Sequence, residues 1–255
     1  MRGTTDSAAW LLKAGHMTNT HLLKPLMAVG ALGLIWSCGG DDATGPDPSP
    51  LPDPESFEET VTNPFFPLTP GSTRFYESSD GAETNTVEVL SETRTILGIS
   101  TTIVHDQVFD DGELIEDTFD WYAQDSEGNV WYLGEDSKEL ENGQVVSTEG
   151  SWEAGVDGAQ AGIVMWADPA AHIGEEYRQE FAEGEAEDLA KVVAAGESVT
   201  VPFGSFSGCI RTEDRNPLES GSTENKVYYP DVGTVLEFPV ESPTERTELV
   251  DFVGP

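Results

Sequence analysis

The stretch STTIVHDQVFDDGELIEDTFDWYA, residues 100–123, decides the fold class. Its two halves alternate apolar with polar residues and are rich in β-branched and aromatic side chains, a pattern typical of half-buried β-strands. The dipeptide Asp111-Gly112 stands between them, and Asp-Gly between alternating runs is the strongest short-range signal for a β-hairpin. This stretch therefore predicts two antiparallel strands, 100–109 and 114–123, joined by a tight turn.

The same pattern continues through residues 57–255, which we expect to form a single domain. Strands on hairpins predict an all-β fold, an antiparallel meander forming a barrel, a half-barrel or a curved-sheet sandwich. Residues 185–195, EAEDLAKVVAA, have the composition of a helix, but the repeat described next favours strand there. The other expected strands are 72–79, 84–91, 129–133, 144–149, 176–181, 198–203, 209–213, 226–229, 234–238 and 246–252.

Two stretches, residues 68–140 and 171–240, resemble one another and predict an internal repeat. Gly71 corresponds to Gly174, and Asp80-Gly81 to Glu183-Gly184 at the same distance from the leading glycine. Repeated supersecondary units bury their apolar faces against each other, so two five-strand units would share one core. Chance similarity between β-meanders is the alternative.

Residues 1–37 read as a secretory signal peptide. Lysines precede a short apolar run, PLMAVGALGLIW at 25–36, and small Ser37 stands before Cys38. The run is shorter than the roughly 20 residues that span a bilayer. The tripeptide Ile35-Trp36-Ser37 resembles a lipobox, although Trp36 is bulky for the middle position, and the resemblance implies cleavage before Cys38 and lipidation of its thiol. An ordinary transmembrane anchor or a buried cysteine is the alternative, and Met17 is a second candidate start.

Residues 38–56 follow as a segment rich in Pro, Gly and Asp. Such a composition buries too little apolar surface to fold, so we expect a disordered tether between lipid and domain. The expected protein is an extracytoplasmic lipoprotein, anchored to the outer membrane in a diderm cell, whose domain binds a ligand or another envelope protein.

The acidic balance restricts the partners further. The chain has a formal net charge of −36, and without residues 1–37 it would carry 9 basic and 47 acidic residues. A surface of this sign repels phosphate backbones, so nucleic-acid binding is excluded. The acids are spread along the chain, which favours solubility as their role over the attraction of cations. Cys209 would be the lone remaining thiol and is expected to be buried and inert.

Four segments resemble a family of bacterial lipoproteins of unknown function that opens with the pattern FPLxPGxxWxY. They are NPFFPLTPGSTRFY at 63–76, WYAQD at 121–125, GNVWY at 128–132 and GSWEAGVDG at 150–158. The resemblance covers most of residues 63–240. It implies a style of fold and no mechanism, because the family has no established activity.

The glycine-rich segment 150–162 is the candidate site, because long irregular loops in compact domains are often functional. A crossover between the repeat halves would explain the glycines equally well. If Glu153 and Asp157 met Glu180, these carboxylates could perform acid–base catalysis in a secreted hydrolase, the alternative function. The deciding observation is whether the three converge in a cavity with Trp152.

Two further groups of residues could hold a ligand. Trp121, Trp131 and Trp152 are candidate binding aromatics, with Arg178 as a charged contact, although core packing explains tryptophans in strands equally well. Oxygen ligands for Ca²⁺ are offered by the turn that contains Asp125, Glu127 and Asn129, which departs from the twelve-residue calcium loop. A plain hairpin turn is the alternative there, and we expect no other cofactor.

Overall fold

The computed structural model describes residues 45–218 and 223–255, which form one antiparallel sheet with two short 3-10 helices. Each pairing is antiparallel, as hairpin connections require. The 3-10 helices are η1 (Pro54–Ser56) and η2 (Pro169–His172), and the strands are β1 (Thr73–Ser78), β2 (Glu83–Ile96), β3 (Ile99–Asp110), β4 (Glu113–Gln124), β5 (Val130–Asp136), β6 (Glu139–Glu141), β7 (Gln144–Ser147), β8 (Trp152–Glu153), β9 (Gln160–Met165), β10 (Glu176–Arg178), β11 (Glu180–Phe181), β12 (Leu189–Val201), β13 (Gly204–Arg215), β14 (Thr223–Tyr229), β15 (Gly233–Pro239) and β16 (Thr247–Val253).

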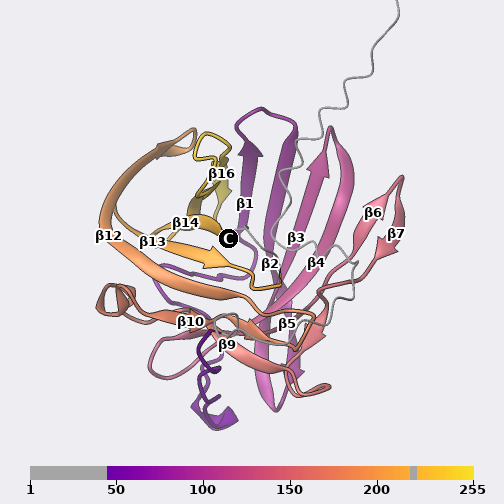
Figure 1. Cartoon of the computed structure of the whole chain (residues 1–255), viewed down its shortest axis with the longest axis vertical. Coiled ribbons are helices and arrows are strands. Elements are labelled where there is room, and N and C mark those ends of the chain that lie inside the picture. The colour runs from indigo at the N-terminus through magenta and orange to yellow at the C-terminus, as the bar shows by residue number, and fades with distance from the viewer. Residues whose placement is uncertain (1–44, 219–222) are drawn as a thin grey trace, which may run out of the picture.

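The sheet is open and strongly curved. Its strands follow the order β10-β12-β13-β14-β15-β16-β1-β2-β3-β4-β5-β9-β11, with β6, β7 and β8 attached at one side. The pairing of β16 with β1 joins the two chain ends of the domain. In Figure 1 β1–β4 run roughly upright while β12 and β13 sweep across them, so the sheet wraps around an interior. The all-β antiparallel class is therefore confirmed: the sheet is curved and is not closed into a barrel.

The predicted hairpins are confirmed, and so is strand in the segment of helical composition. β3 and β4 meet around Asp111-Gly112, and β12 begins at Leu189. β9 is not among the predicted strands: residues 160–162 end the glycine-rich segment, and residues 163–165 continue it without alternation. Its residues from Ala161 to Met165 are all buried, and a fully buried short strand lacks the alternation that marks the others.

The two predicted repeat halves have the same pairing geometry in their first hairpin. The N–H of Gly71 donates to the carbonyl of Val89, and the N–H of Gly174 donates to that of Val192, both at 2.8 Å. Each residue of the second pair lies 103 positions after its counterpart in the first. The runs β1–β5 and β10 with β12–β15 therefore start with the same register.

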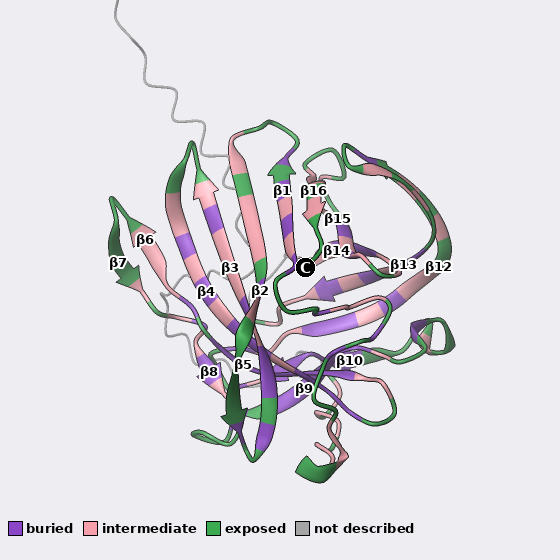
Figure 2. Cartoon of the chain, turned by 180° about the vertical axis from the view of Figure 1, so that it is seen from behind, coloured by how far each residue is buried: buried purple, intermediate pink, exposed green. Residues whose placement is uncertain are grey.

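The main core lies where the strands crowd together at one end of the sheet. Buried segments gather at the lower ends of the strands in Figure 2, while the upper hairpins are exposed. Val130, Leu133, Met165 and Val192 are fully buried there. A smaller cluster around Leu249 includes Cys209, which is fully buried as expected for an inert thiol.

Residues 45–56 lie along the domain in place of the free tether predicted for them. The Pro46 carbonyl accepts a hydrogen bond from Arg178 Nε at 3.1 Å, and the Ser56 carbonyl accepts one from the Ser126 N–H at 2.8 Å. Leu51 packs against the main core. Proline-rich chain lacks many N–H donors but keeps its carbonyls, so it can dock through acceptors and one apolar side chain. The predicted signal peptide, Cys38 and residues 39–44 lie outside the described residues.

Candidate functional site

A cavity of about 240 Å³ lies inside the curve of the sheet. Its walls come from β14, β15, β16, β1, β2, β3, β4 and β5, eight strands that are consecutive in the sheet order. Every second residue of a strand faces one side, so the lining recurs with that period, as at Glu116, Thr118, Asp120 and Tyr122 of β4. The fold thus turns one face of half its strands toward a single space.

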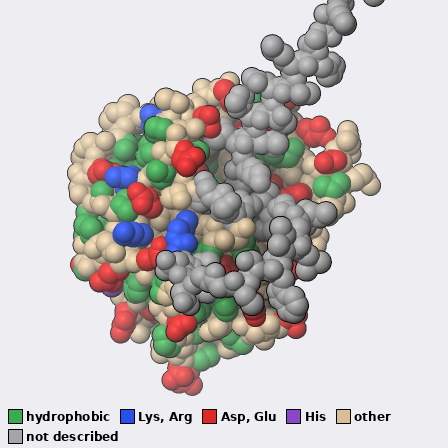
Figure 3. Space-filling view, viewed as in Figure 1, with side chains coloured by type: hydrophobic (Ala, Val, Ile, Leu, Met, Phe, Trp, Pro, Cys, Tyr) green, Lys and Arg blue, Asp and Glu red, His purple; other side chains and the backbone are tan. Residues whose placement is uncertain are grey.

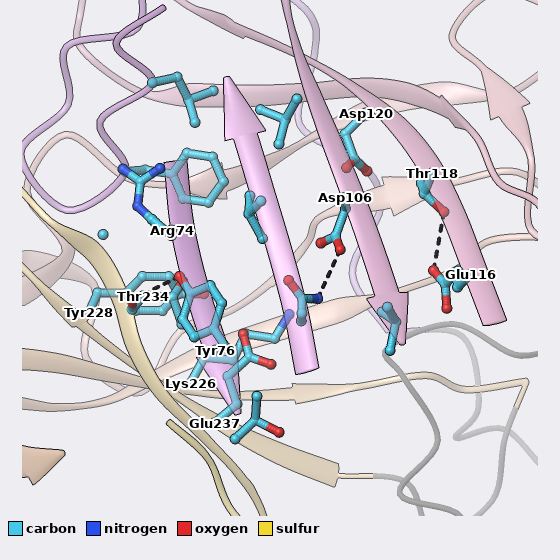
Figure 4. A pocket seen from close by; sticks show the side chains of 18 of the residues that line it. Arg74, Tyr76, Asp106, Glu116, Thr118, Asp120, Lys226, Tyr228, Thr234 and Glu237 are labelled. Carbon is cyan, nitrogen blue, oxygen red and sulfur yellow. Dashed lines mark hydrogen bonds between the residues drawn. The ribbon is translucent and has the colours of Figure 1, made fainter. Parts of the chain in front are cut away.

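Carboxylates dominate the wall formed by β3, β4 and β5. Asp106, Glu116 and Asp120 point into the space in Figure 4, and Glu135 of β5 lines it as well. Asp106 accepts a hydrogen bond from Asn85 Nδ2 at 2.8 Å, and Asp120 accepts one from the Tyr132 hydroxyl. No lysine or arginine from the described parts of these three strands lines the cavity.

The opposite wall carries two cations, each held by other groups. Lys226 of β14 lies beside Glu224 and Glu237 and forms an ion pair with Asp214 at 3.5 Å. Arg74 of β1 donates to two backbone carbonyls, those of Val232 at 2.6 Å and Pro67 at 2.7 Å. Neither cation therefore neutralises the carboxylates of β3–β5 by direct contact within the described structure.

Two of the lining carboxylates keep unpaired oxygens. Glu116 is 7% exposed and Glu135 is 3% exposed. Glu116 Oε1 accepts from the Thr118 hydroxyl at 3.1 Å, but neither its Oε2 nor Glu135 Oε1 has a hydrogen-bond partner among residues 45–218 and 223–255. Because more than nine in ten buried polar groups are satisfied, two unpaired oxygens on one cavity wall mark a place where donors are missing.

The electrostatics of the cavity follow from burial of like charges. Burial raises the pKa of Glu116 to about 8 and that of Asp120 to about 6. Burial, reinforced by the charge of Glu180, raises the pKa of Glu135 well above its ordinary value. On the other wall burial, reinforced by Glu237, raises the pKa of Glu224 to about 8. Near neutral pH the cavity therefore holds protons that a cation could displace.

The predicted catalytic carboxylates Glu153, Asp157 and Glu180 do not line this cavity. Glu153 forms an exposed ion pair with Arg94, and Asp157 lies exposed on a turn with φ of 49°. Glu180 is 1% exposed and accepts a hydrogen bond from Trp152 Nε1 at 2.8 Å. Trp152 thus meets one of the three, in the interior, while the other two face the surface.

The candidate binding aromatics and Arg178 are buried and contact other residues of the domain. Trp121 is buried beneath the Arg94 guanidinium, 3.9 Å from the ring centre, and Trp131 donates through Nε1 to Asp125 at 2.8 Å. Arg178 is buried, forms an ion pair with Glu187 and lies over the Phe181 ring. These contacts match the core-packing interpretation.

The predicted metal turn is satisfied by protein donors. Asp125 Oδ1 accepts from the N–H groups of Glu127 and Asn129, and Oδ2 accepts from Asn129 Nδ2 and Trp131 Nε1, all between 2.8 and 3.0 Å. This is an Asx turn whose carboxylate is already fully used. Within the described chain no three His, Cys, Asp or Glu side chains come close enough to hold a metal ion.

The glycines around segment 150–162 permit close backbone packing. A Cβ on Gly162 would lie 2.5 Å from the Arg178 carbonyl oxygen, and one on Gly134 would lie 2.3 Å from that of Trp152. Gly134 lets β5 approach β8, and Gly162 lets β9 approach residues 178 and 179. Close packing accounts for these two glycines, whereas Gly150 and Gly158 of the segment have open space around them.

The cavity residues were missed in the sequence, although a signal for them exists. Along β4 the residues Glu116, Thr118, Asp120 and Tyr122 share one face, so acidic and aromatic side chains recur with period two. Polar residues at successive positions of one face of a strand flanked by hairpins, here Glu116, Thr118 and Asp120, indicate a polar inner face. Which other strand faces it could not be deduced from that pattern.

Acidic side chains are spread over the surface and are not gathered in one patch. In Figure 3 acidic side chains are scattered over the visible face, and the few lysines and arginines lie on the side of β12 and β13. There Arg211 pairs with Glu197 at 2.9 Å and Arg215 with Glu176 at 2.8 Å. The visible surface therefore offers no basic patch for an anionic partner.

Fold and cavity together define the class: an open, curved antiparallel sheet enclosing an acidic cavity. No model of a protein family matches the chain, and no curated protein matches it. Among solved structures it is similar to "a putative lipoprotein from Parabacteroides distasonis ATCC 8503", with a TM-score of 0.40 and 12% identity over 75% of this chain and 99% of that one. No helix in the described residues is long and apolar enough to cross a membrane.

Proposed function

We propose that the protein is a lipid-anchored extracytoplasmic protein that binds a small polar ligand in the cavity of its curved sheet. The observation that carries the binding role is the pair of buried, unpaired oxygens on Glu116 and Glu135 at the cavity wall. Buried acceptors without donors cost about 1–3 kcal/mol each, and a ligand that supplies donors removes that cost. At about 240 Å³ the space is below the roughly 300–1,000 Å³ of drug-sized pockets, which favours a small molecule.

Binding fits the site better than catalysis does. The cavity lining contains no histidine or cysteine among the described residues, and its one serine, Ser78, donates to Asp80 at 2.7 Å. The hydrolase alternative required Glu153, Asp157 and Glu180 to converge, and two of them face the surface on their own.

The binding role is tested by identifying what co-purifies with the full chain. Protein purified in detergent from its native host is denatured, and the released small molecules are measured by mass spectrometry. We expect one compound in near-stoichiometric amount. Val87→Phe, which adds bulk to a cavity-lining position of β2, should remove it, whereas Val145→Phe on the exposed β6–β7 hairpin should not. Equal recovery from the Val87→Phe variant would place the ligand elsewhere and contradict the proposal.

The lipid anchor rests on the sequence before the domain. Ser37-Cys38 after a short apolar run is the support for lipidation. Cys38→Ala should move the protein from the detergent phase to the aqueous phase in a phase-separation assay. Cys209→Ala is the matched control, because its thiol is buried in the domain. A Cys38→Ala variant that partitions like the parent would rule the anchor out.

A further inference from the structure

We infer that the ligand of the cavity is a small organic cation with more than one amino group, an aliphatic diamine or polyamine. The inference rests on the proposed binding function and narrows it to one chemical class. It is carried by the charge balance of the cavity, by the unpaired buried oxygens, and by walls that combine acids with aromatic rings.

The cavity lining has an excess of acidic over basic side chains, which favours a cationic ligand. Seven carboxylates line the cavity against two basic side chains in the described structure. Arg74 is satisfied by backbone carbonyls, and Lys226 is shared among Asp214, Glu224 and Glu237. Once these carboxylates are ionised, one monovalent cation would leave most of the acidic wall uncompensated, so a ligand with two or more positive charges fits it better. The lining acids are Glu83, Asp106, Glu116, Asp120, Glu135, Glu224 and Glu237.

The unpaired carboxylate oxygens at the cavity wall favour a ligand that donates hydrogen bonds. Glu116 Oε2 and Glu135 Oε1 are acceptors on neighbouring strands, and each is nine-tenths buried or more. An ammonium group carries three donors and no acceptor, so it adds no new unpaired acceptor to this wall. A neutral polyol could also donate, but it would leave the charges uncompensated and bring further acceptors with it.

The geometry favours an organic cation over a metal ion. The acids lie around the space on facing strands, and no three of the described His, Cys, Asp or Glu side chains converge as metal ligands do. Tyrosine rings and apolar side chains lie between them, among them Tyr76, Tyr122 and Val104. Aromatic faces attract ammonium groups, and methylene chains pack on apolar side chains, so the lining suits a molecule with charged ends and an aliphatic middle.

Binding of such a cation must be linked to proton release. The carboxylates have to be ionised to pair with ammonium groups, and burial holds several of them protonated near neutral pH, since it raises the pKa of Glu116 to about 8. Affinity should therefore increase from pH 6 to pH 8. The titratable and charged groups that line the space are Arg74, Tyr76, Glu83, Asp106, Glu116, Asp120, Tyr122, Tyr132, Glu135, Glu224, Lys226, Tyr228 and Glu237. Outside the lining, Glu139 also raises the pKa of Glu116, and Glu180 and Asp188 raise that of Glu135.

The test is isothermal titration calorimetry of the full chain in detergent at pH 8 with 1,4-diaminobutane, butylamine and 1,4-butanediol. We expect the diamine to bind about tenfold or more tightly than the monoamine and the diol to give no heat of binding. Glu135→Gln and Glu116→Gln should each weaken the diamine about tenfold, because each removes a charge and an unpaired acceptor. Glu113→Gln is the matched control on β4, since its side chain is exposed and outside the lining.

Each other outcome overturns the inference. Equal affinity for the diol and the diamine would remove the charge argument. Binding of CaCl₂ or MgCl₂ that Glu135→Gln abolishes would make the occupant a metal ion. If no amine binds while a compound still co-purifies with the parent and not with Val87→Phe, the cation inference is wrong and the binding function stands. If nothing co-purifies either, both are wrong. Melting temperatures of all variants check that each one is folded.

Discussion

Glu116 and Asp117 are neighbours in the sequence, yet their side chains lie on opposite faces of β4. Glu116 faces the cavity with one oxygen unpaired, while Asp117 Oδ1 lies 2.7 Å from His105 Nε2 and accepts from Gln107 at 3.0 Å on the other face. These two adjacent acidic residues thus have different roles because successive side chains of a strand point to opposite faces of the sheet. For this reason the environment and pairing of a carboxylate on β4 depend more on the sheet face that it occupies than on whether it is Asp or Glu.

Glu116→Gln should flatten the pH dependence of stability. A carboxyl whose pKa is raised in the folded state binds more protons folded than unfolded between about pH 4.5 and 8, so stability falls as pH rises through that window. At about 1.4 kcal/mol for each pKa unit, the parent should lose on the order of a few kcal/mol between pH 5 and pH 8, and the variant less. Urea unfolding at both values measures it. Glu113→Gln should behave as the parent does, and an equal loss in Glu116→Gln would show that this group does not titrate in the window.

Asp125→Ala should destabilise the domain strongly, because it leaves the indole N–H of buried Trp131 and two backbone N–H groups without their acceptor. We expect the free energy of unfolding to fall by about 3 kcal/mol. Glu127→Ala, an exposed neighbour in the same turn, should change it by less than about 0.5 kcal/mol. Denaturant melts compare the two. A rise in melting temperature specific to Ca²⁺, lost in Asp125→Ala, would restore the metal interpretation.

At the scale of elements, the strands of the main core are held by contacts between backbones. β9 pairs with β5 and β11. Gly134 of β5 lies against the backbone of Trp152, and Gly162 of β9 lies against the backbone of residues 178 and 179, so closely that a Cβ at either glycine would clash. β8 contributes two residues, and its Trp152 reaches Glu180 of β11 across that junction. The segment between residues 150 and 162 therefore serves as a joint between the β1–β5 and β10–β15 runs of the sheet.

Gly162→Ala tests this joint. Its Cβ would lie 2.5 Å from backbone atoms of residues 178 and 179, which cannot move aside as a side chain can, so we expect a loss of about 3 kcal/mol from overpacking. Gly158→Ala is the control. It has open space around its Cβ and a φ of 91°, so only left-handed strain of about 1–2 kcal/mol applies. Chemical denaturation of both variants gives the comparison, and equal losses would show that close packing at Gly162 is not required.

At the scale of the whole molecule, the acidic residues outnumber the basic ones fourfold, 48 to 12, and many of those in the described chain are exposed to solvent. The resulting self-repulsion opposes the compact state, and salt weakens it by shortening the screening length. The cavity adds like charges in the interior, where salt screens less. Salt concentration thus changes the repulsion between surface acids more than the repulsion between the buried acids of the cavity.

Raising NaCl from about 0.01 to 0.1 M should increase the melting temperature, because the screening length falls from about 30 to 10 Å. CaCl₂ at matched ionic strength should give a similar increase, since the described acids form no metal-binding group. Differential scanning calorimetry measures both. A much larger effect of calcium would reveal a specific site, and a melting temperature independent of NaCl would show that surface repulsion is negligible.

The sequence by itself determined the all-β class, the hairpins and the acidic character of the domain. These features are local: alternation fixes which residues form strands, and Asp-Gly or Asn-Gly pairs fix where the chain turns. It predicted strand even at Leu189, where composition favours a helix, through similarity to the first half of the chain. It missed β9, since a buried strand of small and apolar residues has no alternation to detect.

Only the tertiary structure decided which acids meet. Asp106 and Glu116 reach the same cavity as Glu224 and Glu237, more than a hundred residues farther along, because the sheet curves and β16 pairs with β1. Glu153 and Asp157, four residues apart in the sequence, lie at the surface, whereas Glu180 is buried in the interior. Spacing along the chain fixes the face that a side chain takes within its own strand. The distance between side chains on different strands depends on strand order and curvature, and these are set by packing of the whole sheet.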